Sequence, residues 1–450
     1  MKDLIVKDRG FYKSVLVMAL PIVLQSMITI GVNIMDTVML GSFGETQISA
    51  SSLANSYIDI FHILHMGIGG GAGVLIGQYW GMRDKARIKR VVSIMFRICL
   101  AAVVLFTVLA AMAPAGIMRF YTKDPEVIAK GRTYLLWSLS GFFLHGVTLV
   151  MTLSLRSMKD VRVPFIASCV SFFVNIFFNW VFIFGKLGAP RMEIAGAALG
   201  TVLARVTEAA IIGFYYFRRE QRIAIRLRDL LEPPGEEWGR FMRFGTAVVF
   251  SDLALVVGQN VLAMIMGHIG TPFVAANSIV SPVMRLCNVF AMGLTNASAA
   301  FTGNTIGEKG IEEGKKVGTT FAFLSVGAGV LAGVLLLLIC PAVTGLYNVT
   351  EETQGIARQL MYGVALTMPL FTLQGSLTKG VLRAGGDTKF VLVVEIVTLW
   401  CCALPLGALC GLYWGLSPFL IYLALRSDYL LKALSCVFRL RSGKWIQRIG

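Results

Sequence analysis

The chain has 450 residues, of which 56% are hydrophobic and only 15% are charged, and its formal net charge is +16. A water-soluble protein of this length would carry more charge, so the composition indicates a polytopic membrane protein. The positive charge alone would also suit nucleic-acid binding, but the placement of Lys and Arg argues against that partner. The eight cysteines lie in apolar stretches without metal-ligand spacing, which indicates buried free thiols.

Apolar stretches long enough to cross a bilayer recur along the whole chain, separated by short loops that carry Gly, Pro or charge. We therefore predict an all-α polytopic membrane protein with twelve transmembrane helices. No cleavable signal peptide is expected, because the first apolar stretch is too long. The predicted spans are 14–40, 51–77, 91–118, 133–156, 163–184, 194–217, 241–267, 272–303, 317–341, 357–382, 390–411 and 415–438.

The loops alternate in charge, which predicts the orientation. If the N-terminus lies inside, the segments on the inner side carry most of the 41 Lys and Arg. By the positive-inside rule both termini are then cytoplasmic, in a protein of the inner (plasma) membrane. The longest loop, 218–240, also lies inside, and its arginines are expected to face anionic lipid headgroups.

An internal repeat relates the two halves of the chain. Pairs of identical residues 226 positions apart include Gly41 with Gly267, Gly77 with Gly303 and Gly81 with Gly307. With one inserted residue, "LRSMKD" (155–160) aligns with "LRAGGD" (382–387), so Arg156 pairs with Arg383. The repeat indicates a duplication rather than chance matches in a glycine-rich chain.

The duplication predicts three parts: an N-terminal six-helix lobe (1–217), a cytoplasmic linker (218–240) and a C-terminal six-helix lobe (241–450). Six helices are an even number, so both halves begin on the same side of the membrane and the repeat is parallel. Two such bundles with a cavity between them suit alternating access. The linker, with its "PPG", is the expected hinge or tether.

Several motifs in order resemble those of the multidrug and toxic compound extrusion (MATE) transporters. They are "ALPIVLQSMITIGVNIMDTVMLGSFGETQISA" in the first span, "GQYWGMRDKARIKR" after the second, "LRSMKD" and "LRAGGD" after the fourth and tenth, and "NIFFNWVFIFG" in the fifth. The resemblance covers nearly the whole chain. It implies a cation-coupled antiporter that expels amphipathic, often cationic, organic compounds.

Six carboxylates lie within the predicted spans and are candidates for function, because an acid facing lipid is costly. They should face the bundle interior, a cavity or a partner. The six are Asp36, Asp59, Glu208, Asp252, Glu395 and Asp428.

Asp36 is the leading candidate for binding the coupling ion, since an acid in the membrane can take up a proton or cation and release it into a wetted cavity. Capping by neighbouring Ser or Asn is the structural alternative. The resemblance favours function, because the family places an Asp here, fifteen residues after a proline that bends the helix. That proline would be Pro21, which otherwise is a simple first-turn residue.

Asn175 and Asn179 have i,i+4 spacing in the fifth span and so share a helix face. Both could point at Asp36, with Thr201 of the sixth span completing a polar cluster; packing between helices is the alternative reading. The family often has Asn-x-x-x-Asp here. Asn179 therefore weakens the case for a charge-rich sodium cage, and proton and sodium both stay open as the coupling ion, with possible sodium at Asp36.

Three residues are candidates for a substrate cavity: Asp252, Gln25 and Glu395. Asp252 could neutralise a cationic substrate, bind the coupling ion or be structural. By the repeat, its counterpart is Ser26 and that of Asp36 is Leu262, so the polar sites of the two halves are not copies.

Other polar residues in the spans suggest local pairs. Glu208 follows Arg205 at i+3, which predicts an intrahelical ion pair. His62 and His65 share a helix face and are expected to form a hydrogen-bonded pair. Arg426 and Asp428 are two residues apart and need other partners.

We predict a monomeric secondary antiporter that exports small organic compounds across the lipid bilayer against proton or sodium entry. An alternative is a lipid-linked oligosaccharide flippase, whose cavity arginines would be Arg97, Arg205, Arg285 and Arg426. No clustered catalytic set and no phosphate-binding loop is evident, so we expect neither an enzyme nor a cofactor.

Overall fold

The structure, a computed structural model, describes residues 5–345 and 349–447. Within these residues every regular element is a helix. Eleven helices or continuous helical runs are long and apolar enough to cross a membrane. The predicted all-α membrane architecture is therefore confirmed.

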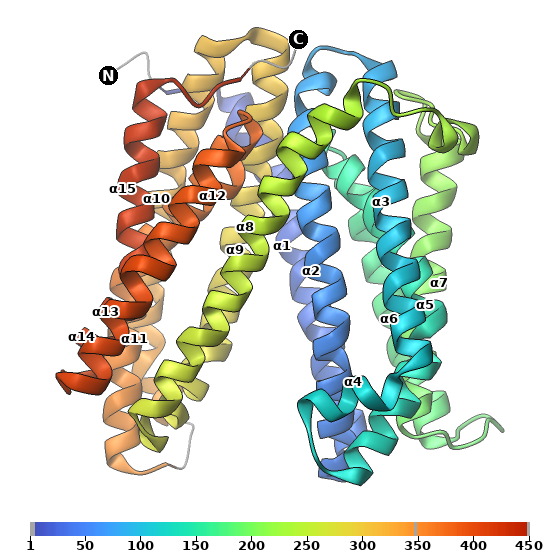
Figure 1. Cartoon of the computed structure of the whole chain (residues 1–450), viewed down its shortest axis with the longest axis vertical. Coiled ribbons are helices and arrows are strands. Elements are labelled where there is room, and N and C mark those ends of the chain that lie inside the picture. Colours follow the sequence, from blue (N-terminus) through green and yellow to red (C-terminus); the bar gives the residue numbers. More distant parts are fainter. Residues whose placement is uncertain (1–4, 346–348, 448–450) are drawn as a thin grey trace. The chain divides into compact units, whose positions relative to one another are not determined.

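The helices of the first half follow the chain from blue to green in Figure 1. They are α1 (Arg9–Gly41), α2 (Glu45–Gly81), α3 (Lys85–Met112), α4 (Pro114–Tyr121), α5 (Pro125–Ser157), α6 (Arg162–Phe184) and α7 (Ile194–Phe214). A π-helical turn, η1 (Tyr215–Arg219), and a 3₁₀ turn, η2 (Leu227–Leu231), follow.

The second half is interrupted more often. Its α-helices are α8 (Glu237–Ile269), α9 (Thr271–Lys309), α10 (Ile311–Gly345), α11 (Glu351–Gly375), α12 (Thr388–Ile396), α13 (Leu404–Ala408), α14 (Pro418–Leu425) and α15 (Ser427–Ser442). Three π-helical segments, η3 (Ser376–Leu382), η4 (Val397–Ala403) and η5 (Leu409–Tyr413), interrupt the tenth and eleventh spans. Such segments are frequent at functional sites.

The first eleven predicted spans each coincide with one of the membrane-length helices. The predicted end of the third span at residue 118 is wrong, because α3 stops at Met112 and Pro114 starts the separate helix α4. Proline lacks the N–H that would continue the ladder. The twelfth predicted span, 415–438, is helical in two pieces, α14 and α15, that are separated at Arg426.

Chain contacts divide the protein into two compact units. Unit 1 contains 1–23, 73–84 and 246–450, and unit 2 contains 24–72 and 85–245. Three helices, α1, α2 and α8, therefore contribute to both units. The predicted lobe boundaries follow the repeat instead, and they stay a prediction.

Within unit 1, the end of α2 crosses α9 at four glycines that the repeat pairs with one another. Gly77 lies against Gly303, since a Cβ built on Gly77 would be 3.6 Å from the Cα of Gly303. A Cβ on Gly81 would overlap the carbonyl oxygen of Asn304, and one on Gly307 that of Gln78. Only glycine permits this approach of two backbones, so matched positions of the two halves meet here.

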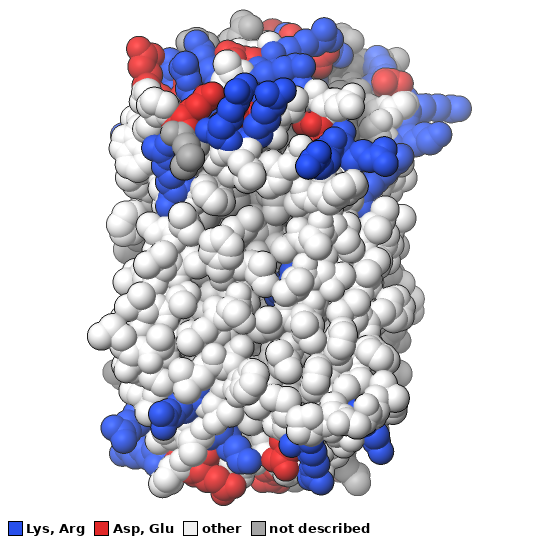
Figure 2. Space-filling view, turned by 90° about the vertical axis from the view of Figure 1, so that its right-hand side faces the viewer, with Lys and Arg blue, Asp and Glu red and all other residues white. Residues whose placement is uncertain are grey.

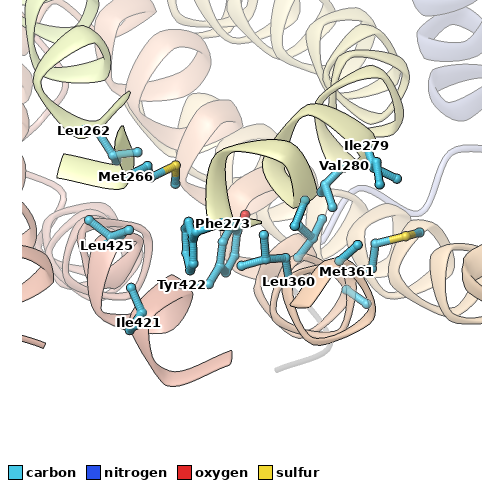
Figure 3. Packing of buried hydrophobic residues seen from close by; sticks show 14 of the residues in the cluster. Leu262, Met266, Phe273, Ile279, Val280, Leu360, Met361, Ile421, Tyr422 and Leu425 are labelled. Atoms are coloured by element: carbon cyan, nitrogen blue, oxygen red, sulfur yellow. The ribbon is translucent and has the colours of Figure 1, made fainter. Parts of the chain in front are cut away.

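The core of unit 1 is apolar and joins residues far apart in the sequence. Figure 3 shows Leu262 and Met266 of α8 near Phe273 of α9, Leu360 of α11 and Tyr422 of α14. These side chains are all at most 3% exposed. Leu262, the counterpart of Asp36 in the repeat, is thus an ordinary core residue.

Unit 2 has a separate core in which aromatic rings of α2 meet α3 and α5. Phe61 is fully buried and packs against Phe106 and Phe142, with ring centroids 5.5 and 5.3 Å apart. On the side of α3 and α7, charged side chains gather near the helix ends and leave a largely uncharged band between them (Figure 2). That band is the surface expected of lipid-facing helices.

The segment 218–240 is attached to α3 within unit 2. Lys89 Nζ lies 2.7 Å from Asp229 Oδ2, and Ser93 Oγ donates to the carbonyl oxygen of Leu230 at 2.8 Å. Burial opposes ionisation of Asp229, but Lys89 and the backbone N–H of Arg226 outweigh it and hold the pKa of Asp229 below its usual value. The segment is therefore docked on a helix, while its role as a hinge stays a prediction.

Candidate functional site

Asp36 of α1 lies in unit 2 among the three neutral polar residues that the sequence singled out. Asn179 Nδ2 donates to Asp36 Oδ1 and also lies 3.2 Å from Asn175 Oδ1. Asn175 Nδ2 in turn donates to Thr201 Oγ1 at 3.4 Å. Asn179 contacts Asp36 directly, whereas Asn175 reaches it only through Asn179. We call these four residues the Asp36 cluster.

The close packing of α6 and α7 positions the polar side chains of the Asp36 cluster. Asn175 and Asn179 are spaced i,i+4 on α6 and are 1% and 0% exposed, whereas Asp36 is half-buried. A Cβ built on Gly200 would overlap Asn179 Oδ1, and one on Gly196 would press on the backbone of Phe182. Glycines four apart on α7 thus bring the two helices close enough to hold the amide of Asn179.

The Asp36 cluster gathers several oxygen atoms around one carboxylate. Asn179 Oδ1 is buried and accepts no hydrogen bond from any described residue. Together with the Asp36 carboxylate, Asn175 Oδ1 and Thr201 Oγ1 it offers the oxygen atoms that hard cations prefer. Among the described residues no group of three His, Cys, Asp or Glu could hold a metal. One carboxylate among neutral oxygens therefore suits a proton or a monovalent cation.

Gln25 belongs to a second polar network of unit 2, one turn after Pro21 on α1. Arg156 Nη2 donates to Gln25 Oε1 at 2.6 Å, and Gln25 Nε2 donates to Ser168 Oγ at 2.7 Å. Ser168 Oγ donates onward to Glu208 Oε1 at 3.3 Å. Pro21 lies inside α1 rather than in its first turn, so it removes a backbone hydrogen bond from that helix.

Asp252 of α8 lies in unit 1 beside two cationic side chains. Arg383 donates to both of its carboxylate oxygens, at 2.8 and 3.2 Å, and Lys379 Nζ lies 3.5 Å from Oδ1. Glu395 of α12 is 2% exposed, and its Oε2 lies 3.7 Å from Arg383 Nη2. We call these four residues the Asp252 cluster. The predicted candidates Asp252 and Glu395 are thus brought together, and Gln25 belongs to another unit.

The two halves of the chain use one arginine in the same way. Arg156 and Arg383, which the repeat pairs, each reach back to the first helix of their own half. Arg156 binds Gln25, and Arg383 Nη2 donates to Ser251 Oγ at 3.3 Å. Gln25 and Ser251 are themselves 226 residues apart. This contact is therefore common to both halves, although the partners differ in chemistry.

Other polar residues of the spans have local partners. Glu208 pairs with Arg205 at 2.8 Å, as the i,i+3 spacing predicts. Asp428 pairs with Lys432 at 2.9 Å on α15. The expected pairing of His62 with His65 is wrong: His62 Nδ1 lies 3.2 Å from His145 Nε2, and His65 bonds the carbonyl oxygen of Phe61. The partner of His62 therefore comes from α5 and not from its own helix.

The sequence reasoning missed three contributors to these sites. Gly200 packs against the side-chain amide of Asn179, and Lys379 and Arg383 form ion pairs with Asp252. A signal existed for Gly200, because Gly196 and Gly200 form a Gly-x-x-x-Gly motif of close helix packing. A signal also existed for Arg383, which the repeat had paired with Arg156. No such signal existed for Lys379, because its place near the end of a predicted span suggested a loop.

Comparison with known proteins gives relatives over almost the full chain. The chain is 24% identical over 439 residues to "Probable multidrug resistance protein NorM" of Thermotoga maritima, covering 97% of this chain and 93% of that protein. It is also 24% identical to "Multidrug resistance protein MdtK" of Yersinia enterocolitica, covering 93% and 96%.

A solved structure shares the fold. The Vibrio cholerae MATE transporter VcmN in the bent form superposes with a TM-score of 0.87 at 17% identity, covering 97% of this chain and 99% of that one. At this identity the likeness establishes the architecture.

The MatE family model matches residues 21–181 and again residues 247–409. The two matches begin 226 residues apart, the offset found within the sequence, so the internal repeat is confirmed. Together they cover well over half of the chain. The chain therefore belongs to the MatE family, the multidrug and toxic compound extrusion transporters that its sequence resembles.

Proposed function

We propose that the protein is a cation-coupled secondary antiporter that exports amphipathic organic compounds, often cationic, by alternating access. The export of drugs is supported by the relatives, two of which are named multidrug resistance proteins. Exchange against proton or sodium entry across the plasma membrane is our inference from the arrangement at Asp36.

One observation carries the coupling role: an acid within a membrane-spanning helix whose partner is a neutral amide. Asn179 donates to Asp36, and no Lys or Arg forms an ion pair with it in the described residues. A carboxylate without an ion-pair partner can take up and give back a proton or sodium ion. Asp252, by contrast, already has Arg383 and Lys379 as partners.

Replacement of Asp36 by Asn tests this role. The amide keeps the shape of the side chain but can neither take up a proton nor balance a sodium ion. Ion-driven dye efflux from proteoliposomes should fall to background, while thermal unfolding of the purified variant stays close to that of the wild type. Asp8→Asn, outside the spans, is the matched control. Unchanged efflux in Asp36→Asn would reject the coupling role.

The flippase alternative receives no support from three of the four arginines proposed for it. Such a site would need guanidinium groups gathered around a pyrophosphate. Arg97 donates instead to the carbonyl oxygen of Glu232, Arg205 pairs with Glu208, and Arg426 donates to Gln259 Oε1 at 3.0 Å. Three of the four thus have separate protein partners.

A further inference from the structure

Two cationic side chains of the Asp252 cluster converge on one carboxylate, yet they are held differently. Arg383 is 7% exposed and fixes both oxygens of Asp252, while Glu395 lies behind it. Lys379 is 45% exposed, and its Nζ lies 3.5 Å from Asp252 Oδ1. Arg383 therefore neutralises Asp252 from the buried side, and Lys379 is the more exposed of the two cations.

The helix geometry brings both cations to the same acid. Lys379 lies within η3, and Arg383 is the residue that follows the end of η3. The two are four positions apart in the chain. Residues four apart lie on one side of a helix, and both meet Asp252 of α8. Lys379 lies near the end of a predicted membrane span and Arg383 follows that span directly, and ionisable residues within a span commonly mark a pathway or site.

The repeat shows that Lys379 is an addition to a shared arrangement. The arginine is present in both halves, as Arg156 and Arg383. At the offset that pairs these two, the counterpart of Lys379 is Thr152, which is buried in α5. The first half thus needs no second cation to hold its arginine in place. The second cation is therefore present beside Asp252 and absent from the matching place in the first half.

We propose that Lys379 binds the carboxylate of a zwitterionic amphipathic compound, whose ammonium group takes the oxygen of Asp252 that Lys379 faces. This proposal rests on the proposed export function and names a substrate class for it. The exchange of partners leaves every charge matched: substrate carboxylate with Lys379, substrate ammonium with Asp252, and Arg383 between Asp252 and Glu395.

The same charges disfavour a purely cationic compound at this site. Such a ligand approaches Asp252 against the repulsion of Lys379 and Arg383, and on binding it leaves Lys379 without an anion. Like charges placed together in a partly dehydrated site cost free energy and so provide selectivity. The Asp252 cluster should therefore distinguish a carboxylate-bearing dye from its ester.

The test compares two ligands that differ only in that carboxylate: a zwitterionic rhodamine with unsubstituted amino groups, whose cationic N–H groups stand in for the ammonium, and its methyl ester, which is a cation. Binding to purified protein in detergent is measured by fluorescence anisotropy, without any ion gradient. The wild type should bind the zwitterion more tightly than the ester. Lys379→Gln should weaken zwitterion binding by about tenfold, as expected for one lost charge-assisted contact, and leave ester binding unchanged or tighter.

Two further variants make the result specific. Lys379→Glu should reverse the preference, so that the ester binds more tightly than the zwitterion. Lys389→Gln, which removes another exposed lysine of unit 1 outside the cluster, should behave as the wild type. An unchanged ratio in Lys379→Gln, or a wild-type preference for the ester, would overturn the proposal. Ion-driven efflux is measured separately, so a failure of export itself is recognised independently of these ratios.

Discussion

Asp36 depends on a neighbour that carries no charge and on a glycine that carries no side chain. Asn179 donates to the carboxylate, and Gly200 of α7 lies against the oxygen of the same amide. Because the amide is fully buried, its orientation is set by packing as well as by hydrogen bonds. The proposed ion site can therefore be disturbed without changing any polar residue.

Gly200→Ala is expected to impair coupling. The new methyl group overlaps Asn179 Oδ1, so the amide must turn or move away from Asp36. Ion-driven efflux should drop by about tenfold, which corresponds to the loss of about 1.4 kcal/mol of interaction. Gly213→Ala on the same helix is the control, because its Cβ would meet only Met151 at an ordinary 4.0 Å. Equal efflux in the two variants would show that Asn179 does not position Asp36.

At the scale of the helices, the glycine-rich part of α2 is explained first by close packing. A Cβ on Gly71 would overlap the backbone of Gly245 in α8, and one on Gly69 would overlap the side chain of Leu153. These contacts lie near the places where helices pass between units: α2 after Ala72 and α8 after Gly245. Bending of these helices during transport stays a prediction.

Gly71→Ala should destabilise the protein more than Gly267→Ala. Its methyl group meets backbone atoms of α8, which cannot rotate away as a side chain would. Overpacking of this kind costs about 1–3 kcal/mol, so the midpoint of thermal unfolding should fall by several degrees. Gly267→Ala in α8, whose Cβ would meet nothing within 4 Å, should leave the midpoint unchanged. Equal midpoints for the two variants would contradict the close contact of α2 with α8.

For the molecule as a whole, the two halves share helix contacts that follow the repeat, but they differ in their charged sites. Both halves keep an arginine bound to their first helix, and glycines related by the repeat meet between α2 and α9. The charged sites differ: Asp36 of unit 2 has neutral partners, and Asp252 of unit 1 has cationic ones. We infer that the first binds the coupling ion and the second contacts the substrate.

Eleven of the twelve spans, the all-α class and the repeat followed from the sequence, because bilayer thickness and duplication leave long periodic signals. The contact of Asn179 with Asp36 also followed, since i,i+4 spacing fixes a helix face. The partners of His62 and Asp252 did not follow, because they come from helices that are remote in the sequence. The break at Arg426 was missed as well, since neither Pro nor Gly stands at it.

Release of the coupling ion on substrate binding tests the central claim most directly. The zwitterionic rhodamine is added to purified protein in weakly buffered solution, and proton release is followed with a pH indicator and sodium release with a sodium-sensitive fluorophore. The wild type should release close to one ion for each dye bound, and Asp36→Asn should bind dye but release none. Equal release from Asp36→Asn and the wild type would contradict the assignment of Asp36 as the coupling residue.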